Sequence, residues 1–333
     1  MTTISITLDP EESSEYVFRP GQILKGTVVL SLSNARKFRG LSIRVFGQSR
    51  TEFLIQGRRR PILQEGVEVY LNTNIYLFGR QDGPAFELKS GTHKYKFSCQ
   101  LPEQLPNSTN LKHGNIEYFV EAVLEVPFMF DKEIKTPFFV DCDDLNHCES
   151  LKEPIRRVEL RNFSQYESLC TTVMLPCSGF VADQIVPITI FYDNNSNSSI
   201  LRTRITFVQS IEFRNTERSE TNSMKNFVHE SYAEGVNARN QKSVATDFRI
   251  PDVVISNTKY CGIISVRYTL EIEPELCGVN ANIKIDIPII IGKIPMKIVP
   301  QRPPSFHASA PPQEQFDNEL PPSYEELMRL KPY

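Results

Sequence analysis

Alternation of apolar and polar residues along many short segments is the feature that most constrains how this chain folds. In residues 116–126 every second side chain is apolar, with Glu117, Glu121 and Glu125 between them, and residues 264–272 repeat the pattern. Successive side chains of a β-strand point to opposite faces, so each segment buries one face and exposes the other to solvent. Gly, Pro, Asn and Ser separate these segments, and no long segment keeps the helical period. The sequence therefore predicts an all-β protein of antiparallel strands packed into sandwiches.

The two halves of the chain resemble each other at an offset of 162 residues. The repeat predicts tandem immunoglobulin-like β-sandwiches of ordinary domain size. An acidic stretch separates the halves, and a proline-rich C-terminal tail is expected to be disordered alone. The matched positions are Phe18 with Phe180, Gln22 with Gln184, Ile23 with Ile185, Val28 with Ile190, and Val45 with Phe207. The predicted boundaries are a first sandwich at 1–143, a hinge or linker at 144–165, a second sandwich at 166–293 and the tail at 294–333.

Composition and charge narrow the classes of partner and the compartment. The 333 residues carry a formal net charge of −3, which provides no general attraction to nucleic acid or to an anionic membrane, so any such contact must be local. The basic cluster also lacks the interleaved aromatic residues that single-stranded nucleic acid requires. Residues 1–8 lack the pattern of a secretory signal, and no apolar run is long enough for a membrane span. The seven cysteines are scattered and odd in number, which suits reduced thiols. We therefore expect a cytoplasmic protein without nucleic acid among its partners.

No pattern of residues indicates catalysis. The five histidines are scattered, and neither the nucleophile motif G-x-S-x-G nor the zinc motif H-E-x-x-H occurs. Cys142, His147 and Cys148 are of the right types for zinc, but their spacing is loose and a fourth ligand is lacking. We interpret them as part of a solvated hinge. The protein is expected to be no enzyme and to use neither a cofactor nor a metal.

One dense basic cluster, Arg58, Arg59 and Arg60, is followed by Pro61. Clustered guanidinium groups bind phosphate oxygens in a bidentate manner, so this loop is a candidate contact for phosphorylated tails or anionic lipid headgroups. Binding of lipid headgroups would bring the protein into peripheral contact with a membrane. The alternative is a solvated hairpin tip without a partner.

The tail carries the clearest docking signal. Pro321 and Pro322 hold the backbone near polyproline II, so little ordering entropy is lost on binding to an aromatic groove. Tyr324 follows at the spacing of the Pro-Pro-x-Tyr ligand of WW domains. Tyr324, Leu327 and Met328 fall on one face of a helical turn, so the last two are candidate accessory contacts. A spacer that contains these residues by chance is the alternative.

A near copy of this motif lies earlier in the tail, where Pro303 and Pro304 precede Ser305 and Phe306. Phe306 keeps the ring and lacks the hydroxyl of a tyrosine, which costs on the order of 1 kcal/mol when a hydrogen bond is lost. We interpret the segment as a second docking site of lower affinity that contributes through avidity. The alternative is that this similarity to the terminal motif arose by chance.

Besides the tail motif, a series of short segments along both halves has a distinctive order. They are FRPGQILKG at 18–26, LPEQLP at 101–106, GNIEYFVEA at 114–122, DK at 131–132, DLN at 144–146, GF at 179–180, QI at 184–185, CGIISVRYTL at 261–270 and IPIIIG at 287–292. Together these motifs resemble the α-arrestins, the arrestin domain-containing proteins, over nearly the whole chain. The resemblance implies two arrestin-type sandwiches and a tail that recruits HECT ubiquitin ligases through their WW domains, a role that falls on Pro321, Pro322 and Tyr324.

The resemblance implies a trafficking adaptor that bridges a membrane receptor or transporter to a ligase. Cargo would then be ubiquitinated, internalised and sorted, with the adaptor recruited from the cytoplasm to plasma membrane and endosomes. The alternative is a ligase-independent sorting scaffold that resembles the arrestin-like subunit of retromer. The chain departs from the family pattern at Phe306, where a second tyrosine is common, and at Ala182-Asp183, where Pro-Gly is usual.

Overall fold

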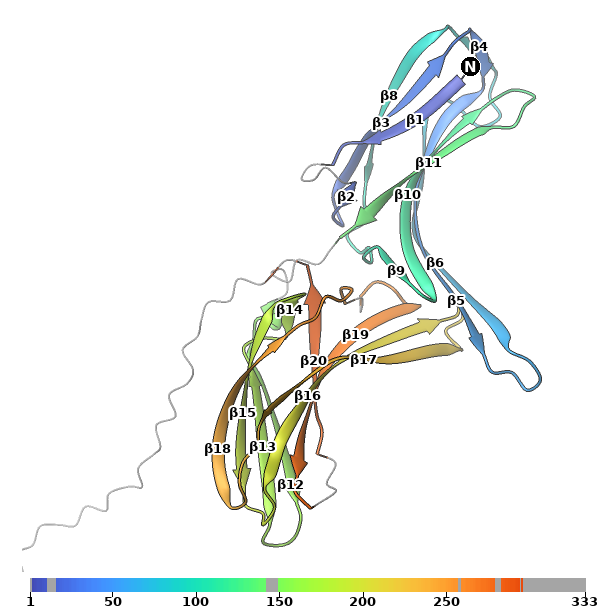
Figure 1. Ribbon diagram of the computed structural model, residues 1–333. Helices are drawn as coiled ribbons and strands as arrows, with labels where there is room; N and C mark the ends of the chain where they lie inside the picture. Colours follow the sequence, from blue (N-terminus) through green and yellow to red (C-terminus); the bar gives the residue numbers. More distant parts are fainter. Residues whose placement is uncertain are drawn as a thin grey trace, which may run out of the picture. The chain divides into compact units, whose positions relative to one another are not determined.

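The chain folds into β-strands that form two sandwiches, which confirms the predicted all-β architecture (Figure 1). The computed structural model describes residues 2–10, 16–141, 149–256, 259–278, 283–293 and 295. Among them the one helical element is the short 3-10 turn η2 (Glu149–Leu151). Residues 1–297 form one compact unit, and the rest of the tail lies outside the described residues.

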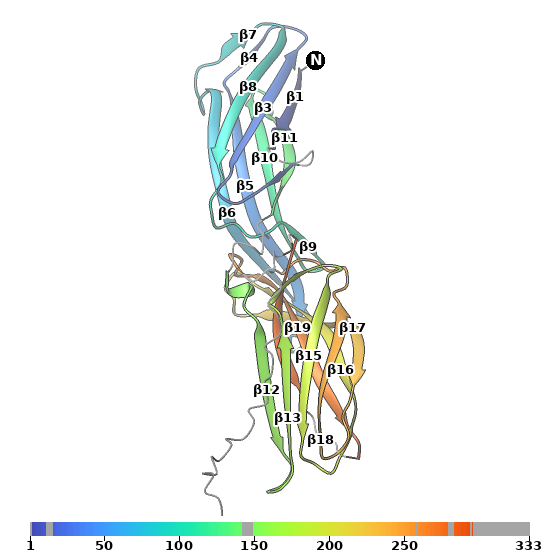
Figure 2. The ribbon, with the colours of Figure 1, turned by 90° about the vertical axis from the view of Figure 1, so that its left-hand side faces the viewer.

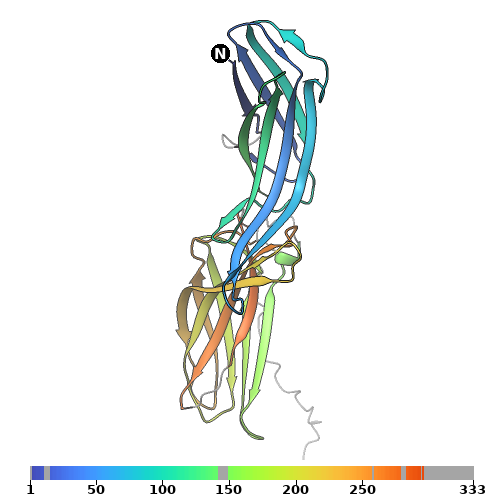
Figure 3. The same cartoon turned by 90° about the vertical axis from the view of Figure 1, so that its right-hand side faces the viewer.

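In the first sandwich a smaller sheet packs on a larger one. The smaller sheet has the order β1 (Thr2–Leu8), β3 (Ile23–Leu32) and β8 (Gly91–Gln100), and it faces the viewer in Figure 2. The larger sheet, seen from the other side in Figure 3, has the order β2 (Val17–Phe18), β11 (Lys132–Val140), β10 (Gly114–Glu125), β5 (Gly40–Ile55) and β6 (Ile62–Gly79), with β9 (Thr109–Leu111) beside β10. A separate pair joins β4 (Arg36–Phe38) to β7 (Phe86–Leu88).

The second sandwich has a four-stranded and a five-stranded sheet. The first has the order β12 (Ile155–Asn162), β13 (Ser168–Leu175), β15 (Ile185–Asn194) and β18 (Asn240–Arg249). The second has the order β14 (Gly179–Val181), β20 (Ile285–Gly292), β19 (Ile264–Leu276), β16 (Ile200–Arg214) and β17 (Thr221–Glu234). Strand β12 lies in the segment expected to be linker, and its side chains are mostly exposed. It is held by its ladder with β13 rather than by an apolar face.

The internal repeat has a structural counterpart. Strand β2 pairs in parallel with β11, and β14 pairs in parallel with β20, whereas the other ladders are antiparallel. The turn after each short strand is closed in the same way. The side-chain oxygen of Gln22 accepts the backbone N–H of Arg19 at 2.9 Å, and that of Gln184 accepts the N–H of Val181 at 3.0 Å. Equivalent residues therefore build equivalent turns in both halves.

Apolar faces of the alternating strands meet in the two cores. In the first sandwich the ring of Tyr118 lies over Gly47, where an added methyl group would come within 2.3 Å of the ring. Its hydroxyl donates to the carbonyl of Pro106 at 2.7 Å. In the second sandwich Tyr268 stacks on Phe207 with ring centroids 5.1 Å apart. Burial of a large side chain contributes about 1.5–3 kcal/mol to stability, so these aromatic layers hold each sandwich together.

Candidate functional site

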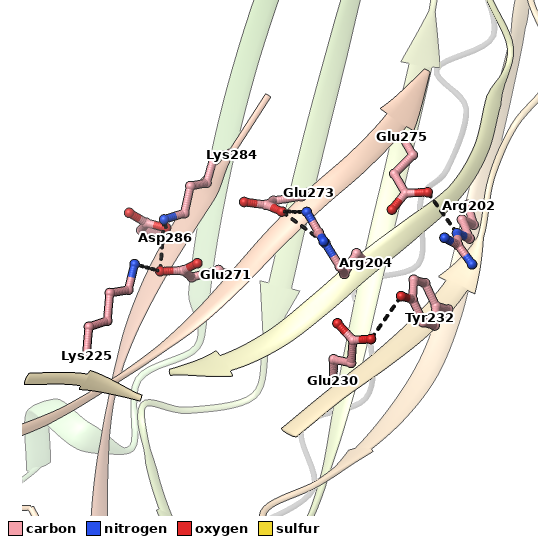
Figure 4. A network of polar contacts seen from close by, with 10 residues as sticks. All are labelled: Arg202, Arg204, Lys225, Glu230, Tyr232, Glu271, Glu273, Glu275, Lys284 and Asp286. Atoms are coloured by element: carbon pink, nitrogen blue, oxygen red, sulfur yellow. Dashed lines mark hydrogen bonds and ion pairs between the residues drawn. The ribbon is translucent and has the colours of Figure 1, made fainter. Parts of the chain in front are cut away.

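A groove of about 740 Å³ lies on the outer face of the five-stranded sheet of the second sandwich. Charged side chains from β16, β17, β19 and the segment that enters β20 line it, and Figure 4 shows most of them with their polar contacts. The lining residues are Arg204, Thr206, Lys225, Phe227, Val228, His229, Glu230, Glu271, Glu273 and Lys284. We name this feature the charged groove.

Strand register places opposite charges beside each other in the charged groove. Arg204 on β16 faces Glu273 on β19, and its Nε donates to Glu273 Oε2 at 3.1 Å. One step further along, Arg202 Nε donates to Glu275 Oε2 at 2.8 Å. The guanidinium of Arg202 also lies 4.1 Å from the ring centroid of Tyr232 on β17. Arginine and glutamate at every second residue therefore form a ladder of ion pairs across the sheet (Figure 4).

Glu271 is the most deeply placed acid of the charged groove, with 5% of its surface exposed. Lys225 and Lys284 each place Nζ 2.8 Å from its Oε1, and Lys284 also lies 3.4 Å from Asp286. Burial by itself raises the pKa of Glu271, but the hydrogen bonds from both lysines outweigh burial and hold the pKa below its ordinary value. The carboxylate is therefore charged in the folded protein at neutral pH.

The outer wall of the charged groove is the end strand of its sheet. Strand β17 pairs with β16 on one side, and a bulge leaves Val228 without a partner in β16. Next to the bulge, Phe227 is 71% exposed. An end strand offers backbone donors and acceptors to an extended segment, and bulges re-aim side chains beside binding sites. The outer edge of β17 therefore offers backbone groups beside the charged groove, whose arginine and lysine side chains are already paired with glutamates.

The predicted basic cluster lies in the turn between β5 and β6. Arg58, Arg59 and Arg60 are all exposed, and none forms an ion pair with a described residue. Leu54 and Leu63 on the flanking strands are also exposed, so the hairpin combines positive charge with apolar surface. Free guanidinium groups of this kind are able to bind phosphate oxygens.

A polar cluster joins the β6 strand to the second sandwich within the compact unit. Glu68 accepts three hydrogen bonds, from Arg218 at 3.0 Å, from the backbone N–H of Gly262 at 2.7 Å and from the Tyr70 hydroxyl at 3.0 Å. Burial, together with nearby Cys261, raises the pKa of Tyr70, so this phenol stays protonated. The half-buried Cys261 packs against the apolar core, and its sulfur accepts the backbone N–H of Ile264 at 3.2 Å.

Several candidate residues from the sequence lie outside the described residues. They are the docking motif and its accessory contacts, the near copy of the motif, and the three metal-type residues of the linker. These are Pro321, Pro322, Tyr324, Leu327, Met328, Pro303, Pro304, Phe306, Cys142, His147 and Cys148. Within the described residues no group of three His, Cys, Asp or Glu side chains is placed to hold a metal ion. No helix in the same part of the chain could cross a membrane.

Sequence reasoning missed the charged groove. The signal was present as two runs of alternating charge, Arg202 and Arg204 in one strand, and Glu271, Glu273 and Glu275 in another. Each run alone is typical of any solvated strand face, and only the register between β16 and β19 brings them together.

The chain matches two family profiles in the order of its two sandwiches. The profile described as arrestin (or S-antigen), N-terminal domain, matches residues 4–142, and the C-terminal domain of the same family matches residues 166–296. Arrestin domain-containing protein 17 of Caenorhabditis elegans is 24% identical over 300 residues, which cover 84% of this chain and 68% of the relative. Arrestin domain-containing protein 4 of Mus musculus is 25% identical over 317 residues, 87% of this chain and 72% of the relative. Arrestin domain-containing protein 1 of Homo sapiens is 23% identical over 326 residues, which cover 91% of this chain and 70% of the relative.

Proposed function

Because the chain belongs to the arrestin family, whose members are arrestin-like trafficking adaptors, we propose that it bridges membrane cargo to a ubiquitin ligase. The cargo is a receptor or a transporter, and the ligase is a HECT enzyme that carries WW domains. The chain itself makes and breaks no bond. It acts in the cytoplasm and is recruited to the plasma membrane and endosomes, where it promotes ubiquitination, endocytosis and sorting of the cargo.

The observation that carries this proposal is the Pro321-Pro322-Ser323-Tyr324 segment of the tail. A preformed polyproline II segment followed by tyrosine has the chemistry that WW grooves recognise. Docking raises the effective concentration of the ligase near cargo that the sandwiches hold, so proximity is the whole mechanism. Leu327 and Met328 extend the contact beyond the tyrosine, and the Pro303, Pro304 and Phe306 segment adds a weaker second dock.

Two surfaces of the sandwiches support contact with cargo. The exposed arginines Arg58, Arg59 and Arg60 have free donors for a phosphorylated tail or an anionic headgroup. The charged groove, with its end strand β17, is suited to an extended cargo segment that pairs along the strand. Binding of cargo at one surface and of ligase at the tail leaves both partners free to act together.

Cell-surface abundance of membrane proteins tests the proposal. Surface-biotinylation proteomics in cells that express the chain should show loss of a subset of receptors or transporters. The loss should disappear with Tyr324→Ala and persist with Tyr333→Ala, a matched change of another tail tyrosine. If Tyr324→Ala keeps the full effect, the tail dock is dispensable and the ligase-independent sorting scaffold becomes the better account.

A further inference from the structure

Three exposed apolar side chains lie at the tip of the hairpin that joins β10 to β11. Phe128 is 97% exposed, Phe130 98% and Met129 61%. Single exposed apolar residues are ordinary on protein surfaces, whereas a contiguous apolar feature marks an interaction site. Figure 1 shows the hairpin beside β4 and the beginning of β1, at one end of the first sandwich. We name residues 128–130 the apolar tip.

The turn of the hairpin holds Phe128 in a conformation that favours glycine. The N–H of Met129 donates to the carbonyl of Val126 at 3.3 Å, which closes a turn with Pro127 second and Phe128 third. Phe128 has a φ of 61°, in the left-handed region that bulky residues avoid. Proline followed by positive φ is typical of a type II turn, whose third position prefers glycine. The aromatic ring is therefore kept there at a local cost, a feature of functional positions.

Positive charge lies directly behind the apolar tip. Arg36 donates to Met129 Sδ at 2.9 Å, and Lys132 Nζ donates to the carbonyl of Thr2 at 3.1 Å. Two acids flank the tip and both accept hydrogen bonds, since Asp131 Oδ1 accepts the N–H of Val126 at 3.1 Å and Glu125 Oε1 accepts the Tyr76 hydroxyl at 3.0 Å. The next acid, Glu133, is exposed and follows Lys132 directly, so strand alternation places it on the opposite face of the sheet from the half-buried lysine.

We propose that the apolar tip inserts into the interfacial region of an anionic membrane. Its convex aromatic and thioether surface enters the boundary between headgroups and acyl chains, and Arg36 and Lys132 meet the lipid phosphates. The tip is distinct from the basic Arg58–Arg60 hairpin, since the two lie at opposite ends of β5. Glu125, at the end of β10, pairs with the first residue of β5, whereas the arginines follow its last.

The proposal rests on the membrane recruitment that the proposed function includes, and its test requires neither ligase nor cargo. The full chain is mixed with vesicles of phosphatidylcholine, with or without about one-third phosphatidylserine. The chain contains no tryptophan, so Phe130→Trp introduces a single reporter. Its emission should shift to the blue with anionic vesicles, whereas Phe227→Trp, on the exposed wall of the charged groove, should show no shift.

Affinity for the same vesicles gives the second readout. The double variant Phe128→Gly/Phe130→Ser should bind roughly tenfold more weakly or worse, because it removes both rings. Thermal melting should show that it is at least as stable as the parent, because glycine relieves the positive φ. Phe227→Ser, a matched loss of an exposed ring, should bind like the parent, and so should Tyr324→Ala.

Several outcomes overturn the proposal. Equal binding by the parent and the double variant would do so, as would absence of binding by the parent. Loss on replacing Arg58, Arg59 and Arg60 with alanine, with no loss in the double variant, would assign the lipid contact to the basic hairpin. A parent that sediments as a dimer, becomes monomeric in the double variant and binds no vesicle would assign the tip to a second copy of the chain.

Discussion

The larger sheets of the two sandwiches share one strand order and carry different chemistry on their outer faces. The order β2-β11-β10-β5-β6 corresponds to β14-β20-β19-β16-β17, strand by strand. Inside, Tyr118 and Tyr268 both lie buried and donate to a backbone carbonyl. Outside, the first sandwich places Arg44 over the ring of Phe46, whereas the second has its ladder of ion pairs. Packing constrains the interior in both halves, whereas the solvent-facing positions carry different side-chain contacts.

One outward position has kept its charge in both halves. Val45 and Phe207 are equivalent in the repeat, and they pair across their sheets with Val120 and Leu270. The residue that follows each partner is a glutamate, Glu121 in the first sandwich and Glu271 in the second. Both glutamates are nearly buried. Glu121 meets one lysine, Lys135, at 3.1 Å, whereas Glu271 meets two. The two sandwiches therefore share their core and one nearly buried acid, and they differ in the number of lysines that contact this acid.

Loss of an equivalent core ring is the strongest test of the shared interior. Phe18→Ala and Phe180→Ala should each destabilise their sandwich by about 3–5 kcal/mol, because both rings are fully buried and leave a cavity. Urea denaturation of each variant measures the loss, and Phe→Leu at the same position is the milder control. A cost below about 1 kcal/mol at one position only would break the equivalence of the two cores.

Removal of the shared acid should affect the second sandwich more than the first. Glu271→Gln leaves two lysines facing each other and should cost about 1–2 kcal/mol, whereas Glu121→Gln frees one exposed lysine and should cost about 0–1 kcal/mol. The same denaturation measurement compares the two. Equal losses would show that the number of lysine partners does not matter.

Acidification should remove the stabilising contribution of Glu271. The pKa of Glu271 is lowered on folding, so its stabilising contribution is complete above the ordinary carboxyl pKa of about 4.3 and is lost as pH falls through the lowered pKa. The free energy of unfolding should therefore decrease more between about pH 6 and pH 3 for the parent than for Glu271→Gln. Parallel pH profiles of the two proteins would contradict this assignment.

The smallest effect is expected at the two equivalent turns. Gln22→Ala and Gln184→Ala each remove one side-chain bond to a turn N–H and should cost about 0.5–1.5 kcal/mol. Thermal melting of the two variants should show similar small shifts. A large shift in one variant alone would mean that the turns have different structural roles.

Sequence periodicity was sufficient to predict the sandwiches and their repeat, because each alternating segment has one buried face. It was insufficient for β12, whose exposed residues carry no such signal and which depends on the β13 ladder. The charged groove was missed for a related reason, since cross-strand pairs such as Arg204 with Glu273 depend on register. Pro127 indicates a turn, but the positive φ of Phe128 could not be predicted, because this turn position prefers glycine.

Calorimetric affinities of the full chain for a panel of WW domains would show whether this chain recruits a ligase through its tail. We expect micromolar binding that is abolished by Tyr324→Ala, retained in Tyr333→Ala and reproduced by a peptide of residues 317–333. Equal affinity of the parent and Tyr324→Ala, or no binding by any WW domain, would contradict the claim that this chain brings a ligase to its cargo.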